Sequence, residues 1–229
     1  MLAFGFILIT ALSIWLFYQA LGRSSRFLLT ALIWSLCLSF LAIQGFFLET
    51  DTIPPRIMLA VLPTLAYVMY TLVKHDLAKI NPLYLLGIHS IRIPVELTLY
   101  GLFLASLIPE IMTFSGWNLD ILVGISAVLI LVYQWRTGKH LSRNVLIVWN
   151  VLGLGFLLTI VGIAILSAPL PFQQLAFEQP NVAVLRFPYV LLPGVVVPLV
   201  LLSHLLSLKY VLRLRGKSSD VMQGEASAH

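Results

Sequence analysis

The sequence predicts an all-α membrane protein, a bundle of seven transmembrane helices with the N-terminus outside and the C-terminus in the cytoplasm. Three observations predict this fold class. The chain of 229 residues is 60% hydrophobic and only 10% charged, and its mean hydropathy is +1.00, a composition typical of membrane proteins. Its apolar runs are long enough to cross a bilayer. Its positive charges fall in every second break between those runs, which sets an orientation.

Seven apolar runs of about 17 to 24 residues are separated by short polar breaks. At about 1.5 Å per residue each can cross a hydrocarbon core of roughly 30 Å, although the third and fifth are only just long enough. The runs lack the alternation of barrel strands, so we expect helices. The predicted spans are Leu2–Leu21, Phe27–Leu48, Ile57–Val73, Ser90–Ile108, Leu119–Trp135, Val145–Ala168 and Tyr189–Leu212.

The orientation follows from the basic residues. The first, third and fifth breaks and the C-terminal end hold eleven of the fourteen Lys and Arg residues. Because basic loops stay in the cytoplasm, these four regions are predicted to be cytoplasmic. This topology explains the net charge of +5, so the charge gives no reason to expect a nucleic-acid partner. The transmembrane domain is predicted to cover residues 1–212, and the polar segment 213–229 to be a disordered cytoplasmic tail.

The fourth span carries ionisable residues where a lipid-soluble helix is expected, in the stretch HSIRIPVELTLYG. Helical geometry places four of them on one stripe. Two of the four, four residues apart, can pair directly. Pro94 lacks the amide that the Ser90 carbonyl would use, which predicts a bend at this level. The stripe consists of His89, Arg92, Glu96 and Tyr100, and the pair is Arg92 with Glu96.

Two other spans carry polar residues at a similar depth. Asn150 lies seven residues after Arg143, and His204 lies five residues before Lys209, which puts them roughly 10 and 7 Å from the cytoplasmic edge. We therefore expect Arg92, Glu96, Asn150 and His204 to form a charged layer in the cytoplasmic half, with Tyr100 beside it. Such residues are candidates for ligand or ion binding. Alternatively, they satisfy one another and only fix helix packing.

The last span contains Pro193, Gly194 and Pro198. Pro198 has no amide to donate to the Gly194 carbonyl, so this helix is expected to be broken or bent. Broken helices occur where transporters and receptors bend around a ligand. Proline and glycine are also simply more common in membrane helices than in soluble ones, which leaves a second interpretation open.

The breaks predicted to lie outside carry acidic residues. Asp120 either caps the fifth helix or faces an outer vestibule. The sixth break, APLPFQQLAFEQPNVAVLRFP, has about 20 residues and is too apolar for disorder. It is therefore predicted to fold back on the bundle as a lid or outer gate. The vestibule candidates, which would attract cations, are Glu110, Asn118, Asp120 and Glu178.

Motifs with specific catalytic mechanics are not found. The sequence has no HExxH, GxSxG, P-loop or EF-hand pattern, so no catalytic residue is assigned and an enzyme is the less favoured class. A single cysteine, Cys37, cannot build a thiolate metal site, and no metal site is predicted. A haem would need two histidines at the same depth in the membrane, whereas the depths predicted for His89 and His204 differ by several ångströms. The cofactor therefore stays unknown.

The segments RIPVELTLYGLFLASLIPEIMTFSGWNLDILVG, WNVL and LSAPLPFQQLAFEQPNVAVLRFPYVLLPG resemble a group of uncharacterised bacterial integral membrane proteins. The resemblance covers Arg92 to His204 and implies the cell inner membrane, with no function to transfer. From the residues we expect a protein that binds a small solute or ion for transport or sensing. The alternatives are an accessory subunit that packs against a membrane partner or a second copy, and an intramembrane enzyme or a haem or quinone redox protein.

Overall fold

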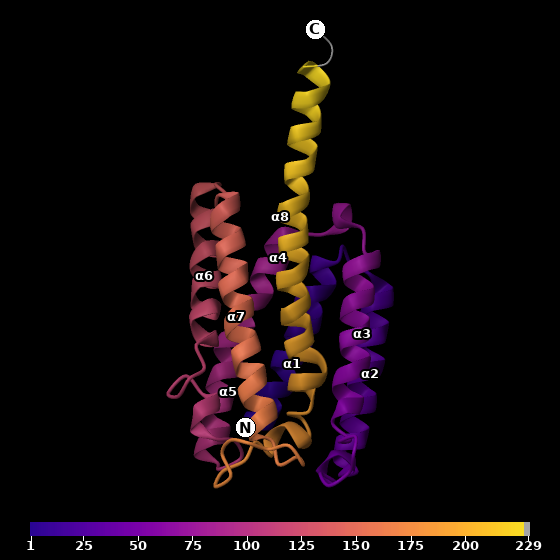
Figure 1. Ribbon diagram of the computed structural model, residues 1–229, viewed down its shortest axis with the longest axis vertical. Coiled ribbons are helices and arrows are strands. Elements are labelled where there is room, and N and C mark those ends of the chain that lie inside the picture. Colours follow the sequence, from indigo (N-terminus) through magenta and orange to yellow (C-terminus); the bar gives the residue numbers. More distant parts are fainter. Residues whose placement is uncertain (227–229) are drawn as a thin grey trace.

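The computed structural model describes residues 1–226, with side chains as far as Arg213, and this part of the chain is helical with no strand (Figure 1). The helices are α1 Leu2–Ala20, α2 Ser25–Ile43, α3 Met58–Lys74, α4 Pro82–Gly87, α5 Arg92–Leu104, α6 Asp120–Thr137, α7 Arg143–Ser167 and α8 Val197–Ala226. The short elements are the 3-10 turns η1 Phe46–Leu48, η2 Leu77–Lys79, η3 Ile88–Ile91, η4 Glu110–Met112 and η5 Ala183–Leu185, and the π-helical turn η6 Leu192–Val196.

Two irregular turns lie inside helical rods. Helix α4 continues through η3 into α5, and η6 continues into α8. The described chain therefore forms seven rods, which confirms the prediction of an all-helical bundle of seven. Five segments are long and apolar enough to cross a membrane: α1, α2, α6, α7 and Leu192–Arg213. Helix α3 is apolar but shorter.

The predicted boundaries hold within a few residues except at the end of the second span, the start of the fourth and the end of the last, described below. The second span ends at Ile43 because Gly45 adopts a positive φ of 73° and turns the chain into η1. The fourth rod begins at Pro82, eight residues before the predicted start at Ser90. Its start is fixed by Asn81, whose Oδ1 accepts the Leu83 amide at 3.0 Å, and by the proline at the first helical position.

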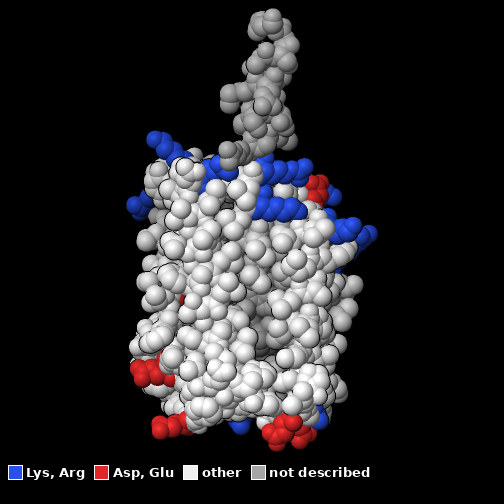
Figure 2. All heavy atoms as spheres, viewed as in Figure 1, with Lys and Arg blue, Asp and Glu red and all other residues white. Residues whose placement is uncertain are grey.

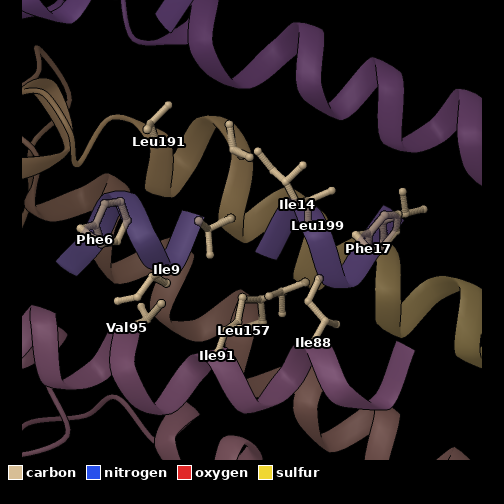
Figure 3. Close-up of a cluster of buried hydrophobic side chains, with 14 of the residues drawn as sticks. Phe6, Ile9, Ile14, Phe17, Ile88, Ile91, Val95, Leu157, Leu191 and Leu199 are labelled. Atoms are coloured by element: carbon tan, nitrogen blue, oxygen red, sulfur yellow. The ribbon is translucent and has the colours of Figure 1, made fainter. Parts of the chain in front are cut away.

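One face of the N-terminal helix α1 packs into the bundle and contributes to its apolar core. Phe6 and Phe17 on α1 are 1% and 0% exposed. Their neighbours come from the fourth rod and from α8 (Figure 3). Around α1 lie Ile88, Ile91, Val95, Leu191 and Leu199. Helix α1 therefore connects the α4–α5 rod to α8 through apolar contacts.

The outer surface of the bundle is also apolar. Large hydrophobic side chains such as Leu36, Phe40 and Leu129 are 70%, 62% and 63% exposed. Lys and Arg gather at the end from which α8 projects, whereas Asp and Glu are concentrated at the opposite end (Figure 2). The surface between the two ends is almost free of charge (Figure 2). An apolar surface between charged ends is the arrangement that a bilayer requires.

Two segments lie outside the predicted spans, the C-terminal segment and the sixth break. Helix α8 continues to Ala226, so most of the segment predicted as a disordered tail has a helical backbone, and residues 227–229 lie outside the described part. The segment between α7 and η6 folds back on the bundle, as its composition predicted. Asn181 N donates to Ser167 O at 2.8 Å and Val182 N to Leu107 O at 3.0 Å.

Candidate functional site

The buried arginine of the fourth rod is the centre of the candidate site. Arg92 is 3% exposed and contacts two other rods. Its Nη1 donates to Asp120 Oδ1 on α6 at 2.9 Å, and its Nη2 lies 3.0 Å from His204 Nε2 on α8. A buried guanidinium needs such partners, because an unpaired charge is costly in a nonpolar environment.

Local sequence explains why these three residues meet. Pro94 cannot donate to the Ser90 carbonyl, and the rod adopts the tighter η3 turn immediately before Arg92. Gly124 then allows α6 to approach closely, since a Cβ at this position would lie 2.9 Å from Ile93 Cγ1 and 3.3 Å from Arg92 Cβ. The close approach brings Asp120, one helical turn earlier on α6, to the guanidinium.

The hydrogen bonds of His204 define its protonation state. Asn150 Nδ2 donates to Leu146 O at 2.8 Å, so Asn150 Oδ1 must face His204 Nδ1, 2.9 Å away. Because Oδ1 only accepts, Nδ1 carries the hydrogen. The guanidinium of Arg92 only donates, so Nε2 must accept. His204 is therefore a neutral imidazole held in one tautomer between Asn150 and Arg92.

The chain of contacts continues on the other side of Asp120. Asp120 N, at the start of α6, donates to Asn118 Oδ1 at 3.0 Å, so Asn118 satisfies one of the amides that a helix N-terminus leaves free. Asn118 Nδ2 donates to Glu96 Oε1 at 2.6 Å and to Met112 O at 3.0 Å. We call the connected set the polar column; in order it is Ser207, Asn150, His204, Arg92, Asp120, Asn118 and Glu96.

The polar column is not saturated. Glu96 Oε2 and Arg92 Nε are buried and have no hydrogen-bond partner. The same is true of both ring nitrogens of His89, which is 0% exposed. The His89 ring stacks on the His204 ring with centroids 4.0 Å apart and meets the Trp149 ring edge-on at 5.1 Å. Unpartnered buried polar atoms are uncommon, and several in one cluster mark an unusual site.

The column is also closed to solvent in this conformation. Each of its charged members is at most 5% exposed. One cavity of about 640 Å³ lies beside the α1–α2 turn, and another of about 330 Å³ lies between α2, α3 and η6. Neither of these two cavities is lined by a residue of the column. Within the described residues, no group of three or more His, Cys, Asp or Glu side chains is placed to hold a metal ion.

The structure corrects the expected arrangement of the charges. Arg92 pairs with Asp120, and Glu96 accepts from Asn118. Two residues assigned to an outer vestibule, Asn118 and Asp120, thus join those assigned to a cytoplasmic layer. The reason is that α6 begins inside the bundle, well short of the ends of α5 and α7 (Figure 1). An apolar run does not reveal whether its first residue lies at a surface.

The position of Glu96 along its helix also differs from the expectation, which takes His89 as the start of the helix. With the rod starting at Pro82, Glu96 is fourteen residues from that end and eight from Leu104, or roughly 21 and 12 Å. The polar groups therefore form a column extending toward the α5–α6 connection, and not a layer near the basic end.

The remaining predicted candidates lie outside the column. Tyr100 is half-buried, with its ring 4.9 Å from that of Phe114. Glu110 and Glu178 are exposed on separate segments. Conversely, sequence reasoning did not assign roles to Ser207, which accepts from Asn150 Nδ2 at 3.1 Å, or to Gly153. A Cβ on Gly153 would lie 2.5 Å from His204 Cε1. The sequence signal for this contact is a glycine one helical turn after Asn150, which allows another helix to approach closely.

A sequence comparison identifies the family of the chain. Residues 55–212 match the domain of unknown function DUF8737. The chain belongs to this family. The match spans more than half of the chain and every residue of the polar column, whereas α1 lies before it. No curated protein and no solved structure matches the chain. The family assignment supports the resemblance to uncharacterised proteins and transfers no activity.

Proposed function

We propose that the chain is an integral protein of the cell inner membrane with its N-terminus outside and its C-terminus in the cytoplasm. The five long apolar helices, the exposed hydrophobic side chains between the two ends and the charge distribution of Figure 2 support it. The basic end would face the cytoplasm. Cysteine accessibility tests the topology: a thiol-specific reagent that does not cross membranes should label a cysteine placed at Glu178 and not one placed at Lys139 in intact cells.

Within this topology, we propose that the polar column binds a small cation, either a proton or a metal cation such as Na⁺, as part of transport or sensing. The observation that carries this proposal is Glu96 Oε2, a buried carboxylate oxygen with no partner. An intramembrane carboxylate is a functional candidate by default, and here its second oxygen is left free.

The balance of charge points to a cation. The column contains two carboxyl groups and one guanidinium, and His204 is neutral by its hydrogen bonds. With both carboxyl groups ionised the column would carry one uncompensated negative charge. An uncompensated charge costs about 2.5 to 3.5 kcal/mol on insertion scales. A cation at Glu96 neutralises it, whereas an anion would double the imbalance.

Because the column is closed, the proposal requires a second conformation that opens it. The two irregular turns are suitable places for such a movement. The η3 turn directly precedes Arg92, and the η6 turn precedes the helix that carries His204. Short 3-10 and π-helical turns inside longer helices often mark hinges and functional sites. The folded-back segment between α7 and η6 would then act as the outer gate.

The test compares Glu96→Gln with Glu110→Gln, a matched loss of an exposed carboxylate. In reconstituted vesicles, a pH-sensitive dye and a Na⁺-sensitive dye would record cation movement. Infrared difference spectroscopy would record a protonated carboxyl group. We expect Glu96→Gln to abolish cation movement and the carboxyl signal, and Glu110→Gln to leave both unchanged. Unchanged movement in Glu96→Gln, together with an unchanged infrared signal, would rule the cation proposal out.

A second candidate function rests on the burial of the column. Since its bonds connect α5, α6, α7 and α8 and its charged residues are buried, it could serve only to lock these helices for contact with a membrane partner. This reading predicts that Glu96→Gln and His204→Ala lower the melting temperature without any effect on cation binding. A partner that co-purifies in fixed ratio would favour it further.

A further inference from the structure

A second polar site lies at the basic end of the bundle, and its lining shares no residue with the polar column. A cavity of about 640 Å³ opens between the α1–α2 turn and the segment leading from η2 into α4. Its lining includes Arg23 on the first side and Lys79 and Asn81 on the second. It contains no aspartate or glutamate. The cavity thus brings two cations from separate segments to one opening.

The two sides of the cavity are held together by the backbone. Gly22 has a φ of 66°, and a Cβ on it would lie 2.7 Å from Lys79 O. Asn81 N donates to Ala20 O at 2.9 Å. Arg23 itself has a positive φ of 62°, a conformation that is uncommon outside glycine, asparagine and aspartate. The close contact at Gly22 leaves no room for a side chain there, so the two sides of the cavity lie directly against each other at this residue.

The polar side chains of the residues that line the cavity are biased toward donors. Gln19 Oε1 already accepts from Arg23 Nε at 3.0 Å, and Asn81 Oδ1 already accepts the Leu83 amide. Their amide nitrogens can still donate, as can the guanidinium and the lysine ammonium. The nearby Asp76 carboxylate accepts from Ala78 N at 3.0 Å. Donors with two positive charges suit an anion with several oxygens, above all a phosphate group.

An apolar stripe leads away from this cavity along α1. Leu8, Leu12, Trp15 and Gln19 follow one another at three- and four-residue spacing, so they share one face. The first three are 54%, 45% and 48% exposed. The Trp15 ring meets the ring of Tyr84, a lining residue, edge-on at 6.2 Å. A phosphate group in the cavity would therefore have an exposed apolar path beside it.

We propose that this cavity binds the phosphate of an anionic glycerophospholipid, with an acyl chain lying along the Leu8–Leu12–Trp15 stripe. The inference goes beyond the cation site and rests only on the proposed membrane topology, which puts the cavity at the cytoplasmic surface. Basic pockets between helices on that side of a membrane are suited to anionic headgroups. The stripe distinguishes a lipid from a free phosphate ion.

The experiment measures lipid retention by the full chain in a neutral detergent. Native mass spectrometry would count bound phosphatidylglycerol, with phosphatidylcholine as the competing zwitterionic lipid. Inorganic phosphate is the second probe, read by the shift in melting temperature. The variant is Arg23→Gln/Lys79→Gln, and its matched control is Arg136→Gln/Lys139→Gln, which removes two cations from the α6 end of the same surface. The wild-type preference for phosphatidylglycerol needs no variant and holds even if the double variant fails to fold.

We expect the wild-type protein to retain phosphatidylglycerol in preference to phosphatidylcholine, and Arg23→Gln/Lys79→Gln to weaken that retention by roughly 10- to 30-fold. The control should retain it. Equal loss in the control would show a general effect of surface charge and overturn the proposal. So would equal retention of the two lipids by the wild type, or a thermal shift by inorganic phosphate with no lipid preference. A chain found in the soluble fraction of cells would overturn the topology and this proposal together.

Discussion

Two clusters of polar groups lie where a proline interrupts a helix. They differ in how many of their hydrogen-bonding atoms have a partner. In the first, Pro198 leaves the Gly194 carbonyl without its helical donor. Trp34 Nε1 donates to this carbonyl at 3.2 Å and Thr64 Oγ1 lies 2.9 Å from it. Trp34 Nε1 also lies 2.9 Å from Thr64 Oγ1. This neutral triad joins α2 and α3 to η6, and it leaves none of its own polar atoms among the buried unpartnered ones.

The second cluster is the polar column beside Pro94. It uses charged groups where the triad uses neutral ones, and it leaves Glu96 Oε2 and Arg92 Nε unpartnered, as are both ring nitrogens of the adjacent His89. The triad shows that neutral groups, all of them hydrogen-bonded, are sufficient to join helices. An unsaturated charged column costs more to bury, so its presence calls for a second explanation. The following predictions test whether this difference is as large as the geometry indicates.

The largest effect is expected from breaking the buried ion pair. Asp120→Ala leaves the Arg92 guanidinium without its carboxylate partner in the interior. Removal of one partner from a buried pair costs about 3 to 5 kcal/mol. Reversible unfolding in mixed micelles would measure the loss, with Glu110→Ala as the matched control on an exposed acid. A loss below that of Thr64→Val would mean that Arg92 finds another acceptor, and the column would then be no more demanding than the triad.

A smaller loss is expected where α7 meets His204. Gly153→Ala places a Cβ 2.5 Å from His204 Cε1 and 2.8 Å from Nε2, which must displace the ring from Asn150 or from Arg92. Overpacking of this kind costs about 1 to 3 kcal/mol. Gly155→Ala on the same helix is the control, because nothing lies within 4 Å of a Cβ there. Equal melting temperatures for the two variants would show that His204 is not held in place.

The fold was largely predictable because it depends on apolar runs and on their spacing. Six of the seven spans begin or end near their predicted residues. The fourth begins earlier than predicted, because Leu83 to Ile88, which follow the Asn81 cap, also belong to the helix. The signal for a helix start was present in the Asn–Pro pair at positions 81 and 82, a pattern that favours a cap and a first turn.

The composition of the candidate site could be predicted, whereas its connections could not. Polar residues in apolar runs are visible in any sequence, and Arg92, Glu96, Asn150 and His204 do lie in one column. Their partners depend on where α6 starts in depth, which an apolar run does not encode. Asp120 was assigned to a surface for that reason. The pairing of Arg92 with Asp120 follows from the close approach at Gly124, a tertiary contact between two helices.

The neutral triad should respond to the loss of one hydroxyl. Thr64→Val keeps the shape of the side chain and removes the group that bonds to Gly194 O and Ala60 O. Side-chain hydrogen bonds between membrane helices are worth about 0.6 to 1.7 kcal/mol, and we expect a loss in this range. Thr30→Val, which removes an exposed hydroxyl bonded to Arg26 O, should have little effect on unfolding. A similar loss in both variants would show that the triad does not join the helices.

The smallest change in stability is expected from Glu96→Gln, even though the same variant should have the largest effect on cation binding. Glutamine keeps the oxygen that accepts from Asn118 and replaces the oxygen that has no partner. The free energy of unfolding should therefore change by less than about 0.5 kcal/mol, whereas Glu96→Ala also strands the Asn118 donor and should cost about 1 to 3 kcal/mol. If Glu96→Gln lowered the free energy of unfolding more than Thr64→Val, Glu96 Oε2 would have a hydrogen-bond partner. The column would then be as saturated as the triad, and helix packing would suffice to explain both.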